Sequence, residues 1–117
     1  RGINKVIFYE NNQTVIKILE KNCQHICAKN QYEIIREDLE NSNIEIDFKD
    51  ISIIYIDPPY NKYNIDKLLL ILQNKINKQT IIGVENSTKD SFMIPKKLNL
   101  FKEKRYGKTN LSILKLT

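Results

Sequence analysis

Hydrophobic positions along the chain alternate between short β-rich runs and stretches with helical spacing. Residues 5–10 (KVIFYE) and 32–36 (YEIIR) are rich in β-branched and aromatic side chains, which predicts two buried strands. Between them, apolar side chains recur every three or four positions over residues 12–28, which predicts an amphipathic helix. Residues 41–50 are polar and alternating, and their pattern fits a helical turn as well as an extended piece.

The second half of the chain repeats this alternation. Residues 51–56 (ISIIYI) are nearly all apolar, as expected for a central parallel strand covered on both faces. Leucine and isoleucine at helical spacing predict a helix over 65–77, and residues 80–85 (TIIGVE) predict another buried strand. Residues 87–98 are polar and contain a proline, which predicts a loop.

The C-terminal end predicts a β-hairpin. Residues 100–106 and 110–116 are strand-like and meet around Gly107. The order of elements is then β-α-β-β-α-β followed by a hairpin. Strands that alternate with helices form parallel sheets, so we predict one α/β domain over residues 1–117, with an antiparallel addition at its end.

Length, composition and charge agree with this prediction. A chain of 117 residues and 13.8 kDa fits one domain, and 41% hydrophobic residues are ordinary for a globular protein. No apolar run approaches the roughly 18–20 residues that span a bilayer, and the first residues do not resemble a secretory signal, so we expect a cytoplasmic protein. The net charge of +5 permits a nucleic-acid partner without requiring one.

Cys23 and Cys27, with His25 between them, are the strongest candidates for metal ligands. On a helix the two thiols share a face while the imidazole points away. A tetrahedral zinc site needs four ligands, and the chain holds no other cysteine or histidine. We therefore expect small buried hydrophobes and no metal.

One short motif carries chemistry: Asp57-Pro58-Pro59-Tyr60, directly after the most hydrophobic strand. Open α/β sheets bind their ligands at the carboxyl ends of central strands. Two prolines make a stiff bend that has carbonyl acceptors and no N–H donors, while Asp57 adds a carboxylate and Tyr60 a flat ring. This set suits a planar ring with an exocyclic amine, whose hydrogens the acceptors would bind. A purely structural turn is the alternative interpretation.

A strand that ends in DPPY resembles motif IV of the amino-methylating, S-adenosylmethionine-dependent methyltransferases. The rest of the chain is similar to the RsmD-like bacterial enzymes, which methylate the N2 amine of a guanine in small-subunit (16S) ribosomal RNA. The segments that carry this likeness include KVIFYEN, IYIDPPYNKYNIDKLLLIL and RYGKTNLSIL. The resemblance implies a Rossmann-like class I methyltransferase fold, S-adenosyl-L-methionine as cofactor, and ribosomal RNA or the small ribosomal subunit as partner.

The same resemblance implies roles for individual residues. Glu10, with Asn11, would bind the ribose hydroxyls of the cofactor, and Asp38, with Leu39, its adenine. The target base would be held by Asp57, Pro58, Pro59 and Tyr60, which are the catalytic residues. Cations that flank this site or the hairpin would contact RNA: Lys62, Lys104, Arg105 and Lys108.

The chain departs from the family at its beginning. A glycine-rich turn is expected roughly 15–20 residues before Glu10, and the chain starts nine residues before it. We therefore expect an N-terminally truncated methyltransferase domain without the first strand, which in this fold lies between the second and the fourth. Such a chain should be poorly stable or aggregate, and should bind the cofactor weakly by itself.

Three alternatives remain open. DPPY also suits adenine-N6 methylation of DNA or RNA, and a chain without the glycine turn could be an inactive remnant or a nucleic-acid-binding fragment. Glutamine methylation of release factors is less favoured, because that branch usually has Asn in place of Asp57.

Overall fold

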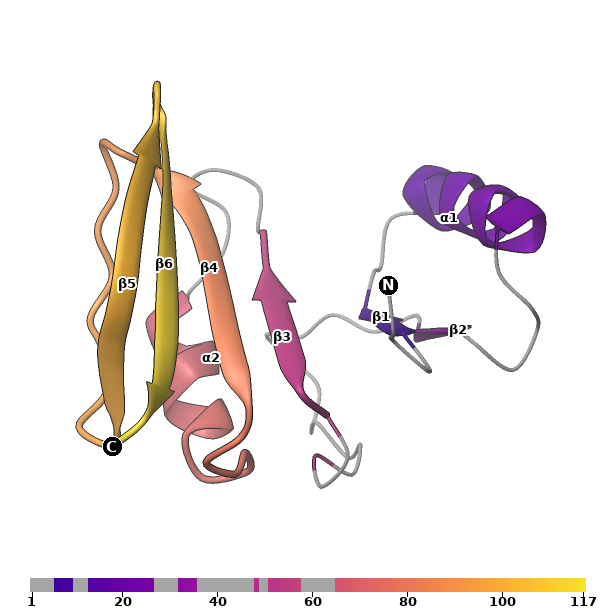
Figure 1. Ribbon diagram of the computed structural model, residues 1–117. Helices are drawn as coiled ribbons and strands as arrows, with labels where there is room; N and C mark the ends of the chain where they lie inside the picture. The colour runs from indigo at the N-terminus through magenta and orange to yellow at the C-terminus, as the bar shows by residue number, and fades with distance from the viewer. Residues whose placement is uncertain (1–5, 10–12, 27–31, 36–47, 49–50, 58–64) are drawn as a thin grey trace. The chain divides into compact units, whose positions relative to one another are not determined.

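The computed structural model describes six stretches of the chain: residues 6–9, 13–26, 32–35, 48, 51–57 and 65–117 (Figure 1). These stretches belong to two compact units, residues 1–44 and residues 45–117, and each unit is described by itself.

The first unit is a β-α-β arrangement. Strand β1 (Val6–Tyr9) pairs in parallel with β2 (Tyr32–Ile35), and helix α1 (Gln13–Ile26) connects them. Ile16 and Cys23, which are seven positions apart on one face of α1, are buried. The two strands and the amphipathic helix predicted in this part of the sequence are confirmed.

The second unit is a four-stranded mixed sheet in the order β3-β4-β6-β5. β3 (Ile53–Ile56) and β4 (Ile81–Ser87) are parallel and are connected through helix α2 (Ile65–Leu72). β5 (Leu98–Tyr106) and β6 (Thr109–Leu116) form an antiparallel hairpin, and β6 also pairs antiparallel with β4. The predicted parallel pair, its helical connection and the antiparallel C-terminal hairpin are therefore confirmed.

Several element boundaries differ from the prediction, among them the end of α2 and the start of β5. Helix α2 ends at Leu72 instead of continuing to residue 77. The backbone then makes turns around Asn77, whose side-chain oxygen accepts from the Gln79 N–H. Strand β5 starts at Leu98, two residues early, because Leu98 is buried and pairs with Leu116.

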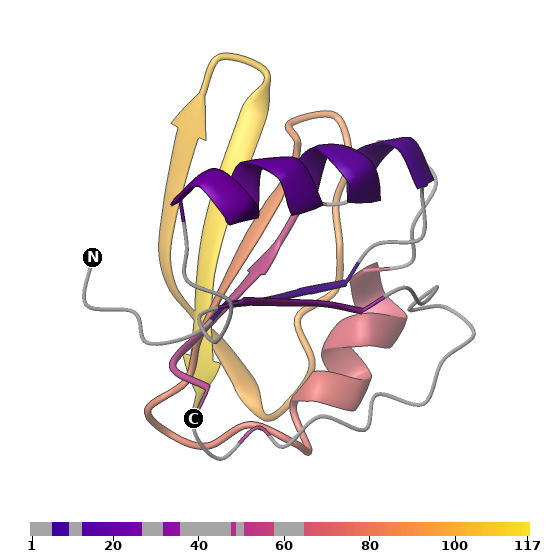
Figure 2. The same ribbon diagram turned by 90° about the vertical axis from the view of Figure 1, so that its right-hand side faces the viewer.

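The hydrophobic core of the second unit lies between α2 and one face of the sheet (Figure 2). Leu68, Leu69 and Leu72 of α2 are buried, as are Ile82 of β4 and Leu114 of β6, which pair across the two strands. A buried helix face against a buried sheet face is the packing that stabilises such a layer.

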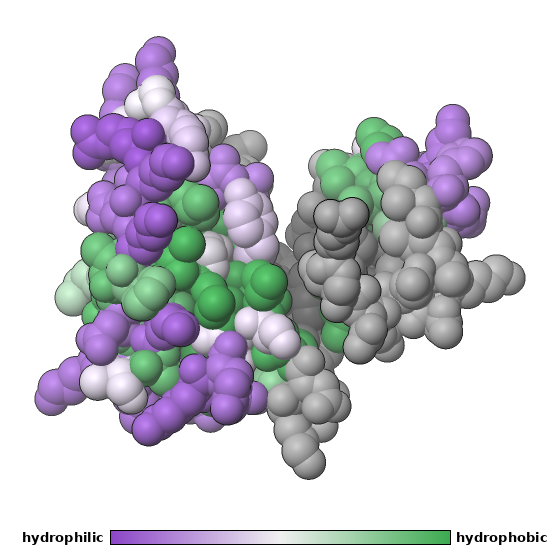
Figure 3. All heavy atoms as spheres, viewed as in Figure 1, coloured by the Kyte–Doolittle hydropathy of each residue, from purple (hydrophilic) through white to green (hydrophobic). Residues whose placement is uncertain are grey.

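The opposite face of this sheet is open and partly apolar (Figure 3). Ile53 and Tyr55 of β3 are each 60% exposed, and Phe101 of β5 is 67% exposed. The sequence suggested that the strand at 51–56 is covered on both faces. Among the described residues that expectation is wrong, because Ile53 and Tyr55 on one face of β3 are exposed, whereas Ile56 on the other face is buried.

Candidate functional site

Asp57 lies where the sequence predicted it, at the carboxyl end of a parallel strand. It is the first residue after β3 and is exposed. The last pair between β3 and β4 is Ile56 with Val84, so Asp57 and Glu85 are the next residues along the two strands. The other residues of the predicted motif, Pro58, Pro59 and Tyr60, lie outside the described part of the chain.

The surroundings of Asp57 favour the protonated form of its carboxyl. Partial burial raises the pKa of Asp57, and the negative charge of Glu85 raises the same pKa further. The carboxylates of Asp57 and Glu85 give this end of the sheet a negative electrostatic potential. Such an end favours a ligand that brings N–H donors or positive charge.

Tyr55 forms the side of this site. It pairs with Gly83 across the two strands, and a Cβ added at Gly83 would lie 3.4 Å from Cδ2 of the Tyr55 ring. Because glycine has no side chain, the ring lies close over it, and the phenol donates a hydrogen bond to Oε2 of Glu85. This hydrogen bond, with burial and the charges of Glu85 and Asp57, raises the pKa of Tyr55 to about 12. The phenol therefore remains a protonated donor that holds the Glu85 carboxylate.

Sequence reasoning missed both Tyr55 and Glu85 as site residues. A signal for each was present. Tyr55 and Asp57 are two positions apart, so strand geometry places them on the same side of β3. Glu85 is an acid within the apolar run IIGVE, on the strand that follows the motif. A carboxylate in such a position is more informative than one in a loop.

The arrangement can hold an amine by its hydrogens. The carboxylates of Asp57 and Glu85 accept hydrogen bonds and have none to donate when ionised. Acceptors of this kind, fixed at a strand end, orient an N–H bond and stabilise positive charge that develops on nitrogen. This is the chemistry that the sequence motif predicts.

The three predicted RNA-contacting cations in the described residues lie on the hairpin, where all three are exposed. Lys104 pairs with Leu111 and Arg105 with Asn110, so their side chains lie on opposite faces of the sheet. The Lys104 ammonium lies 5.1 Å from the centre of the Tyr106 ring. Lys108 follows Gly107 in the turn, and its carbonyl accepts from the Thr88 N–H at 2.9 Å. These three residues therefore do not form one continuous patch.

The predicted cofactor residues follow the strands of the first unit in sequence. β1 ends at Tyr9 and β2 at Ile35, at paired positions in the parallel register. The remaining predicted site residues lie outside the described stretches and stay predictions: Glu10, Asn11, Asp38, Leu39 and Lys62.

The described residues contain no group of three or more histidine, cysteine, aspartate and glutamate side chains that could hold a metal ion. Cys23 is buried in α1, His25 of the same helix is exposed, and Cys27 lies outside the described residues. Among the helices that are described, none combines the length and apolarity needed to span a membrane.

Comparison with known proteins identifies the family. A family model described as conserved hypothetical protein 95 matches residues 1–115. The chain belongs to this family. It is an RsmD-like protein, since it is 32% identical over 112 residues to the ribosomal RNA small subunit methyltransferase D of Buchnera aphidicola. That match covers 88% of the chain and 58% of the relative, so the chain spans less than two thirds of the relative's length.

Other relatives agree with this assignment. An uncharacterized methylase of Rickettsia prowazekii is 36% identical over 69 residues, which cover 57% of the chain and 29% of that protein. A conserved hypothetical protein of Streptococcus pyogenes superposes with a TM-score of 0.79 at 21% identity, covering 100% of the chain and 74% of that structure. An rRNA methylase of Escherichia coli gives a TM-score of 0.62 at 16% identity, covering 100% of the chain and 50% of that structure. The partial Rossmann-like methyltransferase fold is thereby confirmed.

Proposed function

We propose that this RsmD-like chain is the part of an S-adenosylmethionine-dependent methyltransferase that holds its target, the exocyclic N2 amine of a guanine in 16S ribosomal RNA. The observation that carries the proposal is the position of Asp57, an acceptor at the carboxyl end of β3 with Glu85 beside it. Family membership supports methyl transfer, and the name of the Buchnera aphidicola relative supports ribosomal RNA.

The amine of guanine is a weak nucleophile, because its lone pair is delocalised into the ring. Asp57 would accept one of its hydrogens, which turns the lone pair toward the methyl carbon and stabilises the positive charge that develops on nitrogen. Glu85 increases the negative potential there, and Tyr55 keeps the Glu85 carboxylate in place. After transfer the nitrogen loses one proton, which the ionised Asp57 would accept.

The cofactor supplies an electrophilic methyl group on a sulfonium centre. The residues that the family resemblance assigns to it are Glu10, Asn11, Asp38 and Leu39, whose acids suit ribose hydroxyls and an adenine amine. Both acids follow parallel strands of the first unit in sequence, which agrees with ligand binding beyond carboxyl ends. Pro58, Pro59 and Tyr60 would complete the base pocket.

Contacts to RNA are proposed for Lys62, Lys104, Arg105 and Lys108. A target amine has to leave its base stack before it reaches a strand end, so the substrate is an unpaired or flipped nucleotide. Of the exposed cations on the hairpin, Lys104 and Lys108 would bind the flanking phosphates.

Replacing Asp57 tests the proposal directly. The native protein is purified from its own cells and incubated with labelled S-adenosylmethionine and unmethylated 16S rRNA. The nucleoside products are then identified by mass spectrometry. We expect N2-methylguanosine from the wild type and a loss of about 100-fold or more in Asp57→Ala, similar to the loss of other electrostatic stabilisers. Glu20→Gln, which changes a carboxylate on α1, serves as the matched control and should retain activity.

Other outcomes would replace the proposal. N6-methyladenosine as product would favour the adenine alternative. RNA binding without any methylated product would favour an inactive nucleic-acid-binding chain. Equal activity in Asp57→Ala and the wild type would contradict the role of the motif.

A further inference from the structure

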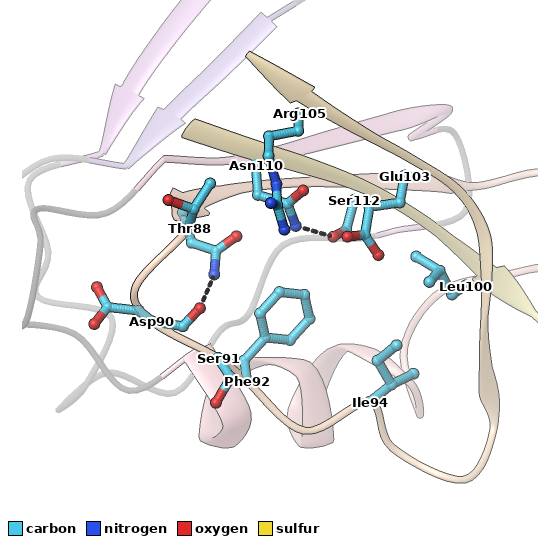
Figure 4. Close-up of a pocket in the computed structure, with 11 residues that line it drawn as sticks. Thr88, Asp90, Ser91, Phe92, Ile94, Leu100, Glu103, Arg105, Asn110 and Ser112 are labelled. Carbon is cyan, nitrogen blue, oxygen red and sulfur yellow. Dashed lines mark hydrogen bonds between the residues drawn. The ribbon is translucent and has the colours of Figure 1, made fainter. Parts of the chain in front are cut away.

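A cavity lies on the face of the sheet that also packs against α2, apart from Asp57 and Glu85 (Figure 4). Its volume is about 240 Å³. The floor is formed by the paired residues Asn86 of β4 and Asn110 of β6, one wall by the segment before β5, and the other by β5 itself.

The floor of this cavity carries polar atoms without partners. Asn86 is 7% exposed, and neither Oδ1 of Asn86 nor Oδ1 of Asn110 has a hydrogen-bond partner in the described part of the chain. The amide of Asn86 has a fixed orientation, because its Nδ2 donates to the Asp90 carbonyl at 3.0 Å, an atom that accepts and cannot donate. Its Oδ1 is therefore a true acceptor without a partner, on a residue that lines the cavity.

Asn110 adds a second unmatched group. Its Nδ2 lies 3.4 Å from the hydroxyl of Ser112, which can accept or donate. Oδ1 of Asn110 has no partner among the described residues. Buried polar groups are nearly always paired, so two such amides in one cavity indicate a ligand or ordered water.

The wall before β5 is held in place by hydrogen bonds at several points. The N–H of Thr88 donates to the Lys108 carbonyl at 2.9 Å, and the N–H of Met93 donates to Oδ1 of Asp66 in α2 at 2.8 Å. The N–H of Lys97 donates to Oε1 of Gln73 at 3.2 Å. The cavity is therefore formed before any ligand arrives, which lowers the ordering cost of binding.

Three side chains give the cavity its chemical character. Figure 4 shows the Phe92 ring from the wall, with the Glu103 carboxylate and the Arg105 guanidinium extending from β5 toward the same space. An aromatic ring binds a flat π-system by stacking. A carboxylate accepts from adjacent N–H groups, and a guanidinium donates to carbonyl or ring-nitrogen acceptors.

We propose that this cavity binds a second, unpaired guanine base of the RNA, distinct from the base that is methylated. Glu103 would accept from the N1–H and the amino group of guanine, Arg105 would donate to its O6 or N7, and Phe92 would stack on the ring. Oδ1 of Asn86 would accept a remaining N–H, directly or through one water. An adenine presents a ring nitrogen where guanine presents N1–H, so it would leave Glu103 without that donor.

The inference rests on the proposed function for the identity of the polymer, and its test needs neither cofactor nor methyl transfer. Guanosine, inosine and adenosine 5′-monophosphates are titrated into the ¹⁵N-labelled protein, and dissociation constants are read from the chemical shifts of the Asn86 and Asn110 side-chain amides. We expect binding in the order GMP, IMP, AMP, with GMP at least about tenfold tighter than AMP. Because all three carry the same phosphate, the ratio reports on the base alone.

Glu103→Gln should abolish the preference for GMP, because an amide cannot accept from both guanine donors in the same way. Lys102→Gln, the neighbour in β5 whose side chain lies on the other face of the sheet, should preserve it. Equal shifts from the three nucleotides, or none, would overturn the proposal and leave ordered water as the partner of Asn86. Guanine-selective binding in a protein without methyl-transfer activity would support this site and reject the proposed function. Methyl transfer without guanine-selective binding would support the proposed function and reject this site.

Discussion

Asp57 illustrates how a single residue can be placed for chemistry at the expense of stability. Burial and Glu85 raise its pKa above the ordinary value of 3.8, so the folded chain binds its proton more tightly than the unfolded chain. The free energy of unfolding therefore falls as the pH rises from 3.8 through the raised pKa. Asp57→Asn should remove this loss, and urea denaturation between pH 4 and pH 7 should show a flatter profile. A profile parallel to that of the wild type would contradict the shift.

The same electrostatics predict the pH dependence of methyl transfer. In the proposed mechanism Asp57 has to be ionised, so activity should rise with pH through the raised pKa of this carboxyl. Burial is the main cause of the raised pKa and the charge of Glu85 adds to it, so in Glu85→Gln the acid limb of the rate profile should move to lower pH. Glu85→Asp, which keeps the charge, should leave the limb nearer to its place in the wild type. If the limb is the same in wild type and Glu85→Gln, the interaction is unimportant for the reaction.

Tyr55 provides a test in the alkaline range. Tyr55→Phe removes the hydrogen bond to Glu85 and should lower the free energy of unfolding by about 1 kcal/mol at neutral pH. The folded-state pKa is raised, so in the wild type this contribution is complete below pH 10.0 and disappears as the pH rises through about 12. The stabilities of wild type and variant, measured by chemical denaturation, should converge over that interval. A constant difference would contradict the assignment.

At this scale the sequence predicts the acceptor and misses its surroundings. Asp57 could be singled out because a proline-locked corner after an apolar strand is a local pattern. Glu85 is 28 positions away in the sequence, and only the register of β3 with β4 brings it beside Asp57. Contacts of that kind depend on strand pairing, which a hydrophobic pattern does not specify.

Among the elements, α2 shows how one helix face holds the sheet. Leu69 is fully buried and Leu70 is 53% exposed, although they are neighbours in the sequence. Leu69→Ala should lower the free energy of unfolding by about 2–5 kcal/mol because it leaves a cavity. Leu70→Ala is the matched control and should cost less than about 1 kcal/mol. Equal losses in urea denaturation would show that α2 packs differently.

The hairpin turn depends on one backbone conformation. Gly107 has φ of 59°, and no atom lies within 4 Å of the place where its Cβ would be. Gly107→Ala therefore introduces backbone strain without a clash, and should cost about 1–2 kcal/mol. Gly107→Asn should cost less, because asparagine tolerates this conformation. Similar values for the two variants, measured by thermal unfolding, would argue against a left-handed turn.

The kinds of element were largely predictable, while their ends and their coverage were not. Period-two and helical patterns gave the strands, the two helices and the hairpin, because those patterns follow from backbone geometry. The end of α2 depends on turns around Asn77, and the start of β5 on its pairing with Leu116. The residues on the exposed face of β3 are apolar, so the sequence does not distinguish this face from a buried one. The position of β3 at the end of the described sheet depends on the order of the strands, which the hydrophobic pattern does not specify.

For the molecule as a whole, the net charge of +5 predicts that the proposed RNA binding weakens as salt is added. If Lys104 and Lys108 contact phosphates, Lys104→Gln and Lys108→Gln should each reduce the slope of log affinity against log salt by about 1. Lys75→Gln, in the turn before β4, serves as the control and should leave the slope unchanged. Filter binding to a 16S rRNA fragment at several salt concentrations measures this slope. If all three variants had the same slope as the wild type, the hairpin lysines would not contact RNA phosphates.

Strand β5 turns Lys104 and Arg105 to opposite sides of a single layer, with Glu103 on the side of Arg105. A residue-by-residue scan of this strand should therefore yield two interleaved phenotypes. Replacements on the face of Lys104 would alter the affinity for any polyanion. Replacements on the face of Glu103 and Arg105 would alter which base is preferred. The two faces of this one strand would thus separate the strength of RNA binding from the choice of base.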